Sequence, residues 1–333
     1  MKKILVLGSS SFGGSTLVDF LLEKNYQVYG TFRRKKNKTY LPYLENKNLK
    51  YFKNFKVDFN SSPKKLINLI LRLKPDYIVD FAAISVVNQS WEFPDIYFDI
   101  NVKYKLEIFK RLSKFNFLKK YILISTPEIF GNTTKLLREK DNNFNPSTPY
   151  ATSKLSAEFL LKNYAKNANF SFIITRFSNF FGPGQPVYRL IPKIITCIDK
   201  KLKFPLEGGG KTRRNFIFSY DFCNGIFKAI KKGKKNNTYH FAGNKYYKIS
   251  DIAKIICKLK SYNYKKLIKI TKSRKGQDII YKLDSKKTRR QLNWKPIFSI
   301  KKALNKVINF SNLKFNKFSN ENVVYTDTNF RKK

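Results

Sequence analysis

Histidine and cysteine are scarce in this chain. Its 333 residues include 1 His and 3 Cys. These counts exclude a metal site built from several histidines, and they allow at most one catalytic triad that depends on histidine. Cys197, Cys223 and Cys257 are widely spaced and form no C-x-x-C motif, so we expect neither a metal site nor a disulfide framework. Unpaired cysteines suit a reducing compartment, and we expect a cytoplasmic protein.

Long apolar runs are also missing. The N-terminal apolar stretch covers only residues 4–7 and ends at Gly8, which is too short for the hydrophobic region of a signal peptide. No stretch reaches the ~18 apolar residues that a membrane-spanning helix needs. We therefore expect no membrane segment and no membrane partner.

Negative charge is the third shortage. Asp and Glu number 22 against 68 Lys and Arg, which gives a formal net charge of +46. The lysines are spread along the whole chain together with many Asn, Ile, Phe and Tyr, a composition that A/T-rich codons produce. We interpret the charge as compositional and expect no nucleic-acid partner, with an RNA-binding protein on the same fold as the alternative. The positive field still favours anionic ligands by long-range attraction.

What the chain does have is a regular alternation of apolar and amphipathic segments. The pattern predicts strands at 4–7, 26–32, 50–58, 77–81, 121–125 and 172–176, and helices at 15–22, 63–74, 95–113 and 149–164. Such alternation predicts an α/β fold, a doubly wound parallel sheet of the Rossmann type. We assign residues 1–178 to this domain, 179–310 mainly to a smaller substrate-binding lobe that can return to the sheet in parts, and 311–333 to a polar tail.

A glycine-rich turn joins the first predicted strand to the first helix. Its pattern is Gly8-x-x-Ser11-x-x-Gly14, with Phe12 inside it. Glycines at such a turn let the backbone approach a pyrophosphate at a helix N-terminus, and the Ser11 hydroxyl can donate to a phosphate. The pattern predicts a dinucleotide site; a simple tight turn between strand and helix is the alternative.

The end of the second strand bears on the choice of dinucleotide. NAD enzymes usually carry Asp or Glu there to bind the ribose 2′-hydroxyl. This chain has Arg33 and Arg34 instead, and guanidinium groups suit a 2′-phosphate. We therefore predict NADP in preference to NAD, with two solvated arginines as the alternative. Asp58 could accept a hydrogen bond from the adenine amino group.

Tyr150 and Lys154 stand four residues apart at the start of a predicted helix, so they share one face. A nearby ammonium lowers the pKa of a phenol, which lets tyrosine act as a general base near neutral pH. The pair follows a strand that ends at Ser125 and Thr126. Inside a dinucleotide-binding fold, this combination indicates a catalytic pair.

Eight stretches together carry a family resemblance. They are 8–14 (GSSSFGG), 80–83 (DFAA), 125–131 (STPEIFG), 146–154 (PSTPYATSK), 176–185 (RFSNFFGPGQ), 213–216 (RRNF), 274–278 (RKGQD) and 292–296 (LNWKP). With them the chain resembles the extended short-chain dehydrogenase/reductases that act on nucleotide sugars, and among these the dTDP-glucose and GDP-mannose 4,6-dehydratases. The resemblance runs from residue 3 to about residue 309.

The resemblance implies a role for each matching residue. Tyr150 would take the proton of the sugar 4-hydroxyl, with Lys154 lowering its pKa and holding the nicotinamide ribose. Thr126 would hydrogen-bond the same hydroxyl, and Glu128 would be the base that removes the C5 proton. Further implied contacts are with the cofactor, at Phe81, Ala82 and Ala83, and with the substrate, at Ser85, Asn179, Arg189, Arg214 and Arg274.

Two departures from the family pattern bear on the activity. Pro127 stands where the dTDP-glucose enzymes carry an acidic general acid, and Arg33 with Arg34 is of the GDP-mannose type, whereas 274–278 is of the dTDP-glucose type. The predicted function is a redox-neutral nucleotide-sugar 4,6-dehydratase, a lyase, with dTDP-glucose as the first candidate substrate. A UDP-glucuronate decarboxylase and a nucleotide-sugar 4-epimerase stay open as alternatives. Relatives commonly pair through two helices, so we expect a homodimer.

Overall fold

The computed structural model describes residues 1–33, 40–58, 63–112, 114–168, 170–273 and 276–318, so the predicted site residues Arg34 and Arg274 lie outside it. Seven parallel strands form the main sheet in the order β11-β7-β5-β4-β1-β2-β3. They are β1 (Lys3–Leu7), β2 (Gln27–Phe32), β3 (Phe52–Lys56), β4 (Tyr77–Asp80), β5 (Lys120–Ser125), β7 (Phe172–Phe177) and β11 (Asn237–Phe241). The predicted doubly wound parallel sheet is confirmed.

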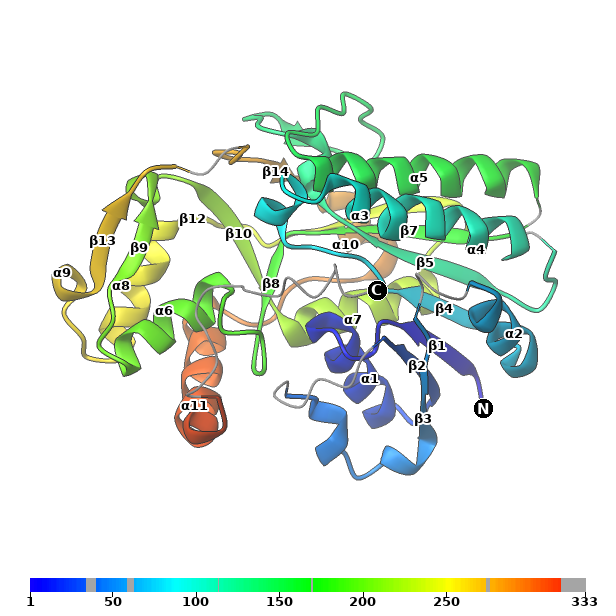
Figure 1. Cartoon of the computed structure of the whole chain (residues 1–333), viewed down its shortest axis with the longest axis horizontal. Coiled ribbons are helices and arrows are strands. Elements are labelled where there is room, and N and C mark those ends of the chain that lie inside the picture. Colours follow the sequence, from blue (N-terminus) through cyan, green and yellow to red (C-terminus); the bar gives the residue numbers. More distant parts are fainter. Residues whose placement is uncertain (34–39, 59–62, 113, 169, 274–275, 319–333) are drawn as a thin grey trace.

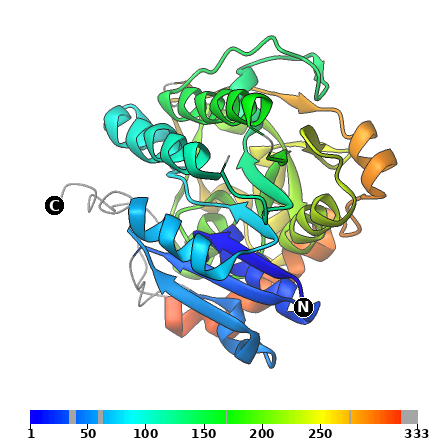
Figure 2. The same ribbon diagram turned by 90° about the vertical axis from the view of Figure 1, so that its right-hand side faces the viewer.

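Helices cover both faces of this sheet (Figure 1). The first face is covered by α1 (Phe12–Glu23) and α7 (Ser219–Lys232), and the second by α2 (Pro63–Leu73), α4 (Tyr104–Leu112) and α5 (Pro149–Asn167). Figure 2 shows the last three side by side. Because both faces are buried, β1 and β4 are apolar almost throughout, as strands of a covered parallel sheet must be.

The predicted helix 95–113 is a helical run with a wider turn inside it. It consists of α3 (Pro94–Phe98), a π-helical turn η4 (Asp99–Lys103) and α4. A π turn shifts the register of the side chains that follow it, and such turns are frequent at functional sites. Here the turn brings Asn101 and Lys105 toward the residues that follow β4.

A smaller lobe packs beside the carboxyl ends of the main strands (Figure 1). Its strands are β8 (Asn179–Phe181), β9 (Phe204–Glu207), β10 (Arg213–Phe218), β12 (Tyr246–Lys248) and β13 (Ile268–Thr271), and its helices are α6 (Leu190–Asp199), α8 (Ile249–Leu259), α9 (Tyr264–Leu267) and α11 (Ile300–Phe318). The lobe has an apolar core of its own, in which Ile194, Ile256 and Leu304 are fully buried. A short pair, β6 (Leu136–Leu137) with β14 (Lys282–Leu283), and the helix α10 (Lys286–Leu292) connect it to the main domain.

β3 and the last helix have other bounds than predicted. β3 ends at Lys56, two residues before Asp58, and residues 311–318, predicted as part of a polar tail, belong to α11. β11 comes from the second half of the chain and completes the main sheet beside β7. Within the part of the chain that the structure covers, no helix has the length and apolar character needed to cross a bilayer.

Candidate active site

The glycine turn after β1 has the geometry that the sequence predicts. Gly8 has a φ of +79°, and a Cβ atom on Gly14 would lie 2.3 Å from the Gly8 carbonyl oxygen. Ser11 begins α1: its Oγ accepts from the Gly14 N–H at 3.1 Å and donates to the Gly8 carbonyl at 2.7 Å. The hydroxyl proton therefore stabilises the turn, and the predicted bond from Ser11 to a phosphate would require that proton to turn away from Gly8.

This turn lies where the order of the strands reverses. β1 is flanked by β2 and β4, and a Cβ atom at Gly8 would lie 3.2 Å from the Ala82 nitrogen. Crevices at such a reversal, outside the carboxyl ends of the strands, are the usual ligand site of doubly wound sheets. The N-terminus of α1 opens onto the same edge, and Arg33 and Asp58 follow β2 and β3 there. The residues present therefore fit a dinucleotide.

Three of the four predicted catalytic residues are together in the structure. Thr126 precedes the short helix η5 (Pro127–Phe130), and its Oγ1 accepts from the Glu128 N–H at 3.2 Å. Pro127 occupies the first helical position, where its fixed φ suits a helix start. The Tyr150 phenol is hydrogen-bonded with Thr126 and lies close enough to feel the Glu128 charge.

Burial decides the acidity of Tyr150. It raises the pKa of the phenol well above 10, and the Glu128 charge raises it further. The positive charge of Arg189 and the hydrogen bond with Thr126 act in the opposite direction but are smaller. The predicted lowering of this pKa by Lys154 is not found, and the Lys154 ammonium donates to the Ile124 carbonyl at 2.7 Å.

Lys154 lies between two buried ion pairs. Burial lowers its pKa to about 8, and the neighbouring Lys105 lowers it as well, whereas Asp80 and Glu158 raise it. Lys105 is paired with Asp80, and Glu158 is paired with Arg176 at 2.6 Å. Burial therefore has the largest effect on the charge state of Lys154, and charged side chains from β4, α4 and α5 adjust it.

His240, the single histidine of the chain, makes two specific polar contacts. Its Nδ1 lies 3.2 Å from the Leu137 carbonyl, and its Nε2 lies 3.1 Å from Nη1 of Arg176. Because arginine only donates, Nε2 must accept, and the ring is neutral with its proton on Nδ1. Burial and Arg176 lower the pKa of His240, which agrees with this state. The ring thus holds Arg176, and through it Glu158, which also accepts from Ser125 at 2.5 Å.

The predicted substrate residues form two groups. In the first, Arg189 donates to the Ser85 hydroxyl at 3.0 Å. In the second, the Arg214 guanidinium lies over the ring of Tyr281 at 4.6 Å, and the Tyr281 hydroxyl donates to Oδ1 of Asn179 at 3.2 Å. One residue of each group, Arg189 and Tyr281, lies close enough to Tyr150 to influence the pKa of its phenol.

Sequence reasoning missed Tyr281. Burial raises its pKa, and the Glu128 charge contributes in the same direction, so the ring lies near the Glu128 carboxylate. Its segment is held in place by Asn132, whose Oδ1 accepts from the N–H groups of Ile279 and Ile280, both at 3.1 Å. The available signal was its position three residues after the stretch 274–278.

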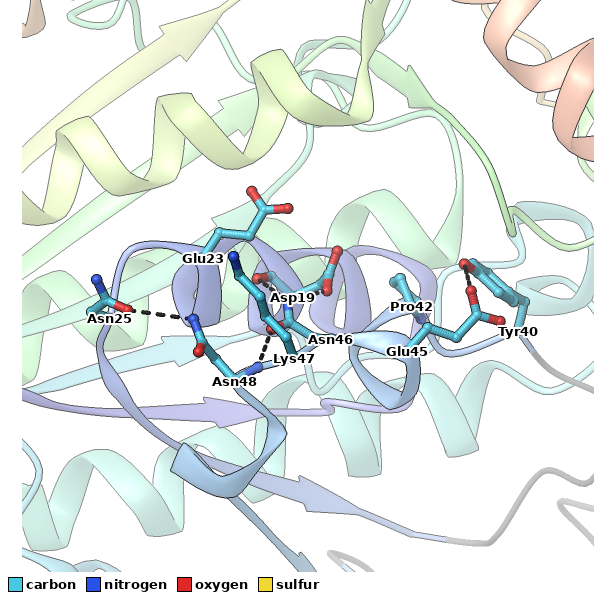
Figure 3. A pocket seen from close by; sticks show the side chains of 9 residues that line it. All are labelled: Asp19, Glu23, Asn25, Tyr40, Pro42, Glu45, Asn46, Lys47 and Asn48. Carbon is cyan, nitrogen blue, oxygen red and sulfur yellow. Dashed lines mark hydrogen bonds between the residues drawn. The ribbon is translucent and has the colours of Figure 1, made fainter.

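A separate pocket of about 660 Å³ lies on the outer side of α1 (Figure 3). It is lined by Asp19, Glu23, Asn25, Tyr40, Pro42, Glu45, Asn46, Lys47 and Asn48. None of these residues belongs to the catalytic or substrate groups above. Among the described residues, no group of three or more His, Cys, Asp or Glu side chains is arranged to hold a metal ion.

Comparison with known proteins identifies the class. The family model described as GDP-mannose 4,6 dehydratase matches residues 5–307. The chain belongs to this family of nucleotide-sugar dehydratases, and the predicted resemblance to extended short-chain dehydrogenase/reductases is confirmed.

Curated relatives include two dTDP-glucose 4,6-dehydratases. The Escherichia coli protein is 27% identical over 345 residues, which cover 92% of this chain and 93% of that protein. The human protein is 26% identical over 329 residues, which cover 96% of this chain and 92% of that protein. Among solved structures, dTDP-glucose 4,6-dehydratase from Bacillus anthracis in complex with NAD has a TM-score of 0.87 at 23% identity, covering 97% of this chain and 100% of that one. This likeness confirms the fold.

Proposed function

We propose that this chain catalyses the 4,6-dehydration of a nucleotide sugar, with dTDP-glucose as substrate. The observation that carries the proposal is the carboxylate of Glu128 beside the buried phenol of Tyr150. An epimerase needs only the Tyr150 group for oxidation and reduction at C4, whereas elimination across C5 and C6 also needs a base at C5. Glu128 supplies that base.

Tyr150 and Thr126 act at the sugar 4-hydroxyl. A nicotinamide dinucleotide in the crevice would supply hydride transfer from C4 and back to C6, which would make the overall reaction redox-neutral. Tyr150 takes the hydroxyl proton while Thr126 holds the same oxygen in place. Because burial raises the pKa of Tyr150, the phenolate depends on the Arg189 charge and the hydrogen bond with Thr126, both of which lower that pKa.

In the elimination, Glu128 acts first as a base and then as an acid. The carboxylate removes the proton from C5, and the C6–O bond then breaks, so that the departing hydroxide needs one proton to leave as water. Pro127 has no proton to give, whereas Glu128 has just received one. We infer that Glu128 passes this proton to the departing oxygen, so that one carboxyl group serves both transfers.

The cations of the substrate groups suit a diphosphate. Arg189 and Arg214 are anchored by Ser85 and by the Asp278 carbonyl, the latter at 2.7 Å, which preorganises their guanidinium groups. Asn179 and Ser85 provide neutral contacts beside them. Arg274 stays a predicted member of this set.

The preference between NAD and NADP is a separate proposal. Arg33 follows β2 directly, where a 2′-phosphate would lie, and we infer that NADP binds more tightly. The Bacillus anthracis protein was solved with NAD. Fluorescence titration of the chain with each cofactor tests this, and tighter binding of NAD would contradict it.

The test of the activity is a panel of nucleotide sugars. dTDP-glucose, GDP-mannose, UDP-glucose and UDP-glucuronate are incubated separately with the protein and NAD or NADP, and the products are measured by mass spectrometry. Loss of one water from dTDP-glucose supports the proposal, and loss from another sugar would change the substrate only. Loss of carbon dioxide from UDP-glucuronate, or an epimer of unchanged mass, would overturn the dehydratase assignment.

We also propose a homodimer that pairs through the helical run 94–112 and through α5. α4 and α5 lie side by side on the outside of the molecule (Figure 2), and Phe98 of α3 and Phe159 of α5 are 38% and 45% exposed. Burying such rings against a second copy would stabilise the pair. Light scattering at micromolar concentration tests the proposal, which a monomer would contradict. The three buried, free cysteines support a cytoplasmic location.

A further inference from the structure

A second buried ion pair lies behind the cofactor crevice. Lys105 on α4 contacts Oδ2 of Asp80, the last residue of β4, and both side chains are at most 1% exposed. The Tyr121 hydroxyl donates to the same oxygen. Burial raises the pKa of Tyr121, so its phenol keeps the proton that it donates.

This cluster holds both polar groups of one peptide unit. The Ala82 N–H donates to Oδ1 of Asp80 at 2.9 Å, and the Ala82 carbonyl accepts from Lys105 at 2.7 Å. Two residues further along the chain, the Asn101 side chain accepts from the Ile84 N–H at 3.0 Å and donates to the Ile84 carbonyl at 3.2 Å. Two side chains of one helical run, Asn101 and Lys105, therefore hold the segment after β4 in place.

The fixed segment forms a wall of the cofactor crevice. Phe81 donates its N–H to the Leu7 carbonyl at 2.9 Å, and Gly8 lies against the Phe81–Ala82 peptide so closely that a Cβ atom would be 3.2 Å away. Movement of Ala82 would therefore move the surface on which the glycine turn packs. A shift of this kind at a binding wall weakens ligand binding without a change in the contacting residues.

We propose that Lys105 is a positioning residue of the cofactor site: paired with Asp80, it clamps the Ala82 peptide and places a positive charge behind Lys154. The proposal rests on the proposed function, because it takes the occupant of the crevice to be a nicotinamide dinucleotide. Lys105 touches neither the sugar nor the reacting atoms, and it acts through Ala82 and Lys154.

The positive charge of Lys105 affects the pKa of Lys154, and this effect can be measured. Three charged groups face Lys154: Lys105 from α4, Asp80 from β4 and Glu158 from α5. Lys105 makes the largest of the three contributions and lowers the pKa of Lys154, whereas the other two raise it. Removing Lys105 and Asp80 together therefore raises the pKa of Lys154.

The test is the double variant Asp80→Asn/Lys105→Met. It leaves no unpaired buried charge. The introduced amide oxygen still accepts from the Ala82 N–H, and the amide NH2 group, in the place of Oδ2, can donate to the Tyr121 hydroxyl, but nothing donates to the Ala82 carbonyl. The matched control is Asp199→Asn/Lys260→Met, which removes a 2.7 Å ion pair in the smaller lobe, at side chains 15% and 11% exposed. Three quantities are measured in the whole chain: affinity for NAD and NADP, hydrogen exchange of the segment 78–84, and the alkaline limb of the pH profile of turnover.

We expect one lost hydrogen bond to the wall to weaken cofactor binding about tenfold and to speed exchange of the segment by a similar factor. The alkaline limb moves to higher pH, and the control changes none of these quantities. A stable double variant with the affinity or the exchange of the unsubstituted protein would overturn the proposal, and so would an unshifted limb in that variant.

The outcomes separate this proposal from the proposed function. If the unsubstituted protein binds NAD or NADP but does not dehydrate dTDP-glucose, the substrate is wrong, and affinity and exchange still decide about Lys105. If it binds neither dinucleotide, both proposals fall. If it binds and dehydrates while the double variant matches it, only the role of Lys105 is refuted.

Discussion

Replacing Lys154 with methionine is expected to stabilise the folded chain at neutral pH while it abolishes turnover. Lys154 is 5% exposed, and burial lowers its pKa from 10.5 to about 8. A lysine with a lower pKa in the folded state binds its proton less well there than in the unfolded state. The folded state is therefore penalised wherever the unfolded lysine is still protonated.

The size and the pH range of the effect follow from these two pKa values. The interval from 10.5 to about 8 corresponds to roughly 3 kcal/mol of unfolding free energy at 1.36 kcal/mol per pKa unit. The penalty is complete below pH 8 and disappears as the pH rises to 10.5. Methionine removes it but loses the hydrogen bond to the Ile124 carbonyl, which costs about 1 kcal/mol. The variant should thus gain about 2 kcal/mol at pH 7 and lose about 1 kcal/mol above pH 10.5.

The assay is urea unfolding of both proteins, followed by circular dichroism at several pH values from 7 to 10.5. Lys120→Met is the matched control, because Lys120 also donates to a backbone carbonyl, that of Ile230 at 2.8 Å, but is only partly buried. It should show a smaller gain. A Lys154→Met variant that is less stable at pH 7, or whose difference from the unsubstituted protein does not change with pH, would refute the reasoning.

Three further substitutions test the site. Tyr150→Phe removes the proton acceptor and should lower turnover ~10²-fold or more while cofactor affinity, measured by titration, is unchanged. Glu128→Gln should spare oxidation and block elimination, so that absorbance of reduced nicotinamide builds up after substrate is added; full turnover would show that Glu128 is not the base. Arg176→Met leaves Glu158 buried without its partner and should cost about 3–5 kcal/mol in unfolding experiments. Adding Glu158→Gln should restore much of this loss, and a double variant as unstable as the single one would contradict the ion-pair explanation.

Local patterns account for what the sequence could predict. The apolar run 4–7, the turn from Gly8 to Gly14 and the pair of Tyr150 and Lys154 each lie within one strand, turn or helix, so their geometry follows from neighbouring residues. The roles of Thr126 and Glu128 came from the family resemblance of the stretch 125–131, and they stay predictions. These predictions needed no knowledge of how distant segments meet.

Contacts between distant segments could not be predicted in this way. Lys105 lies on an amphipathic helix in a chain rich in lysine, and nothing local distinguishes it from a solvent-exposed lysine until Asp80 is seen beside it. His240 meets Arg176 because β11 pairs with β7 in that register, which no single segment specifies. Tyr281 reaches the Glu128 region for the same kind of reason: its position depends on contacts with Asn132, some 150 residues away in the chain.

The pairing of β11 with β7 has a consequence for how the protein is made. Until residues 237–241 leave the ribosome, β7 is an open sheet edge with unpaired N–H and carbonyl groups. The apolar core under α1 is also incomplete, since Leu292 and Trp294 belong to it. A fragment ending at residue 178 should therefore aggregate instead of folding as a free-standing nucleotide-binding domain, and a stalled or truncated nascent chain would expose the same edge to chaperones.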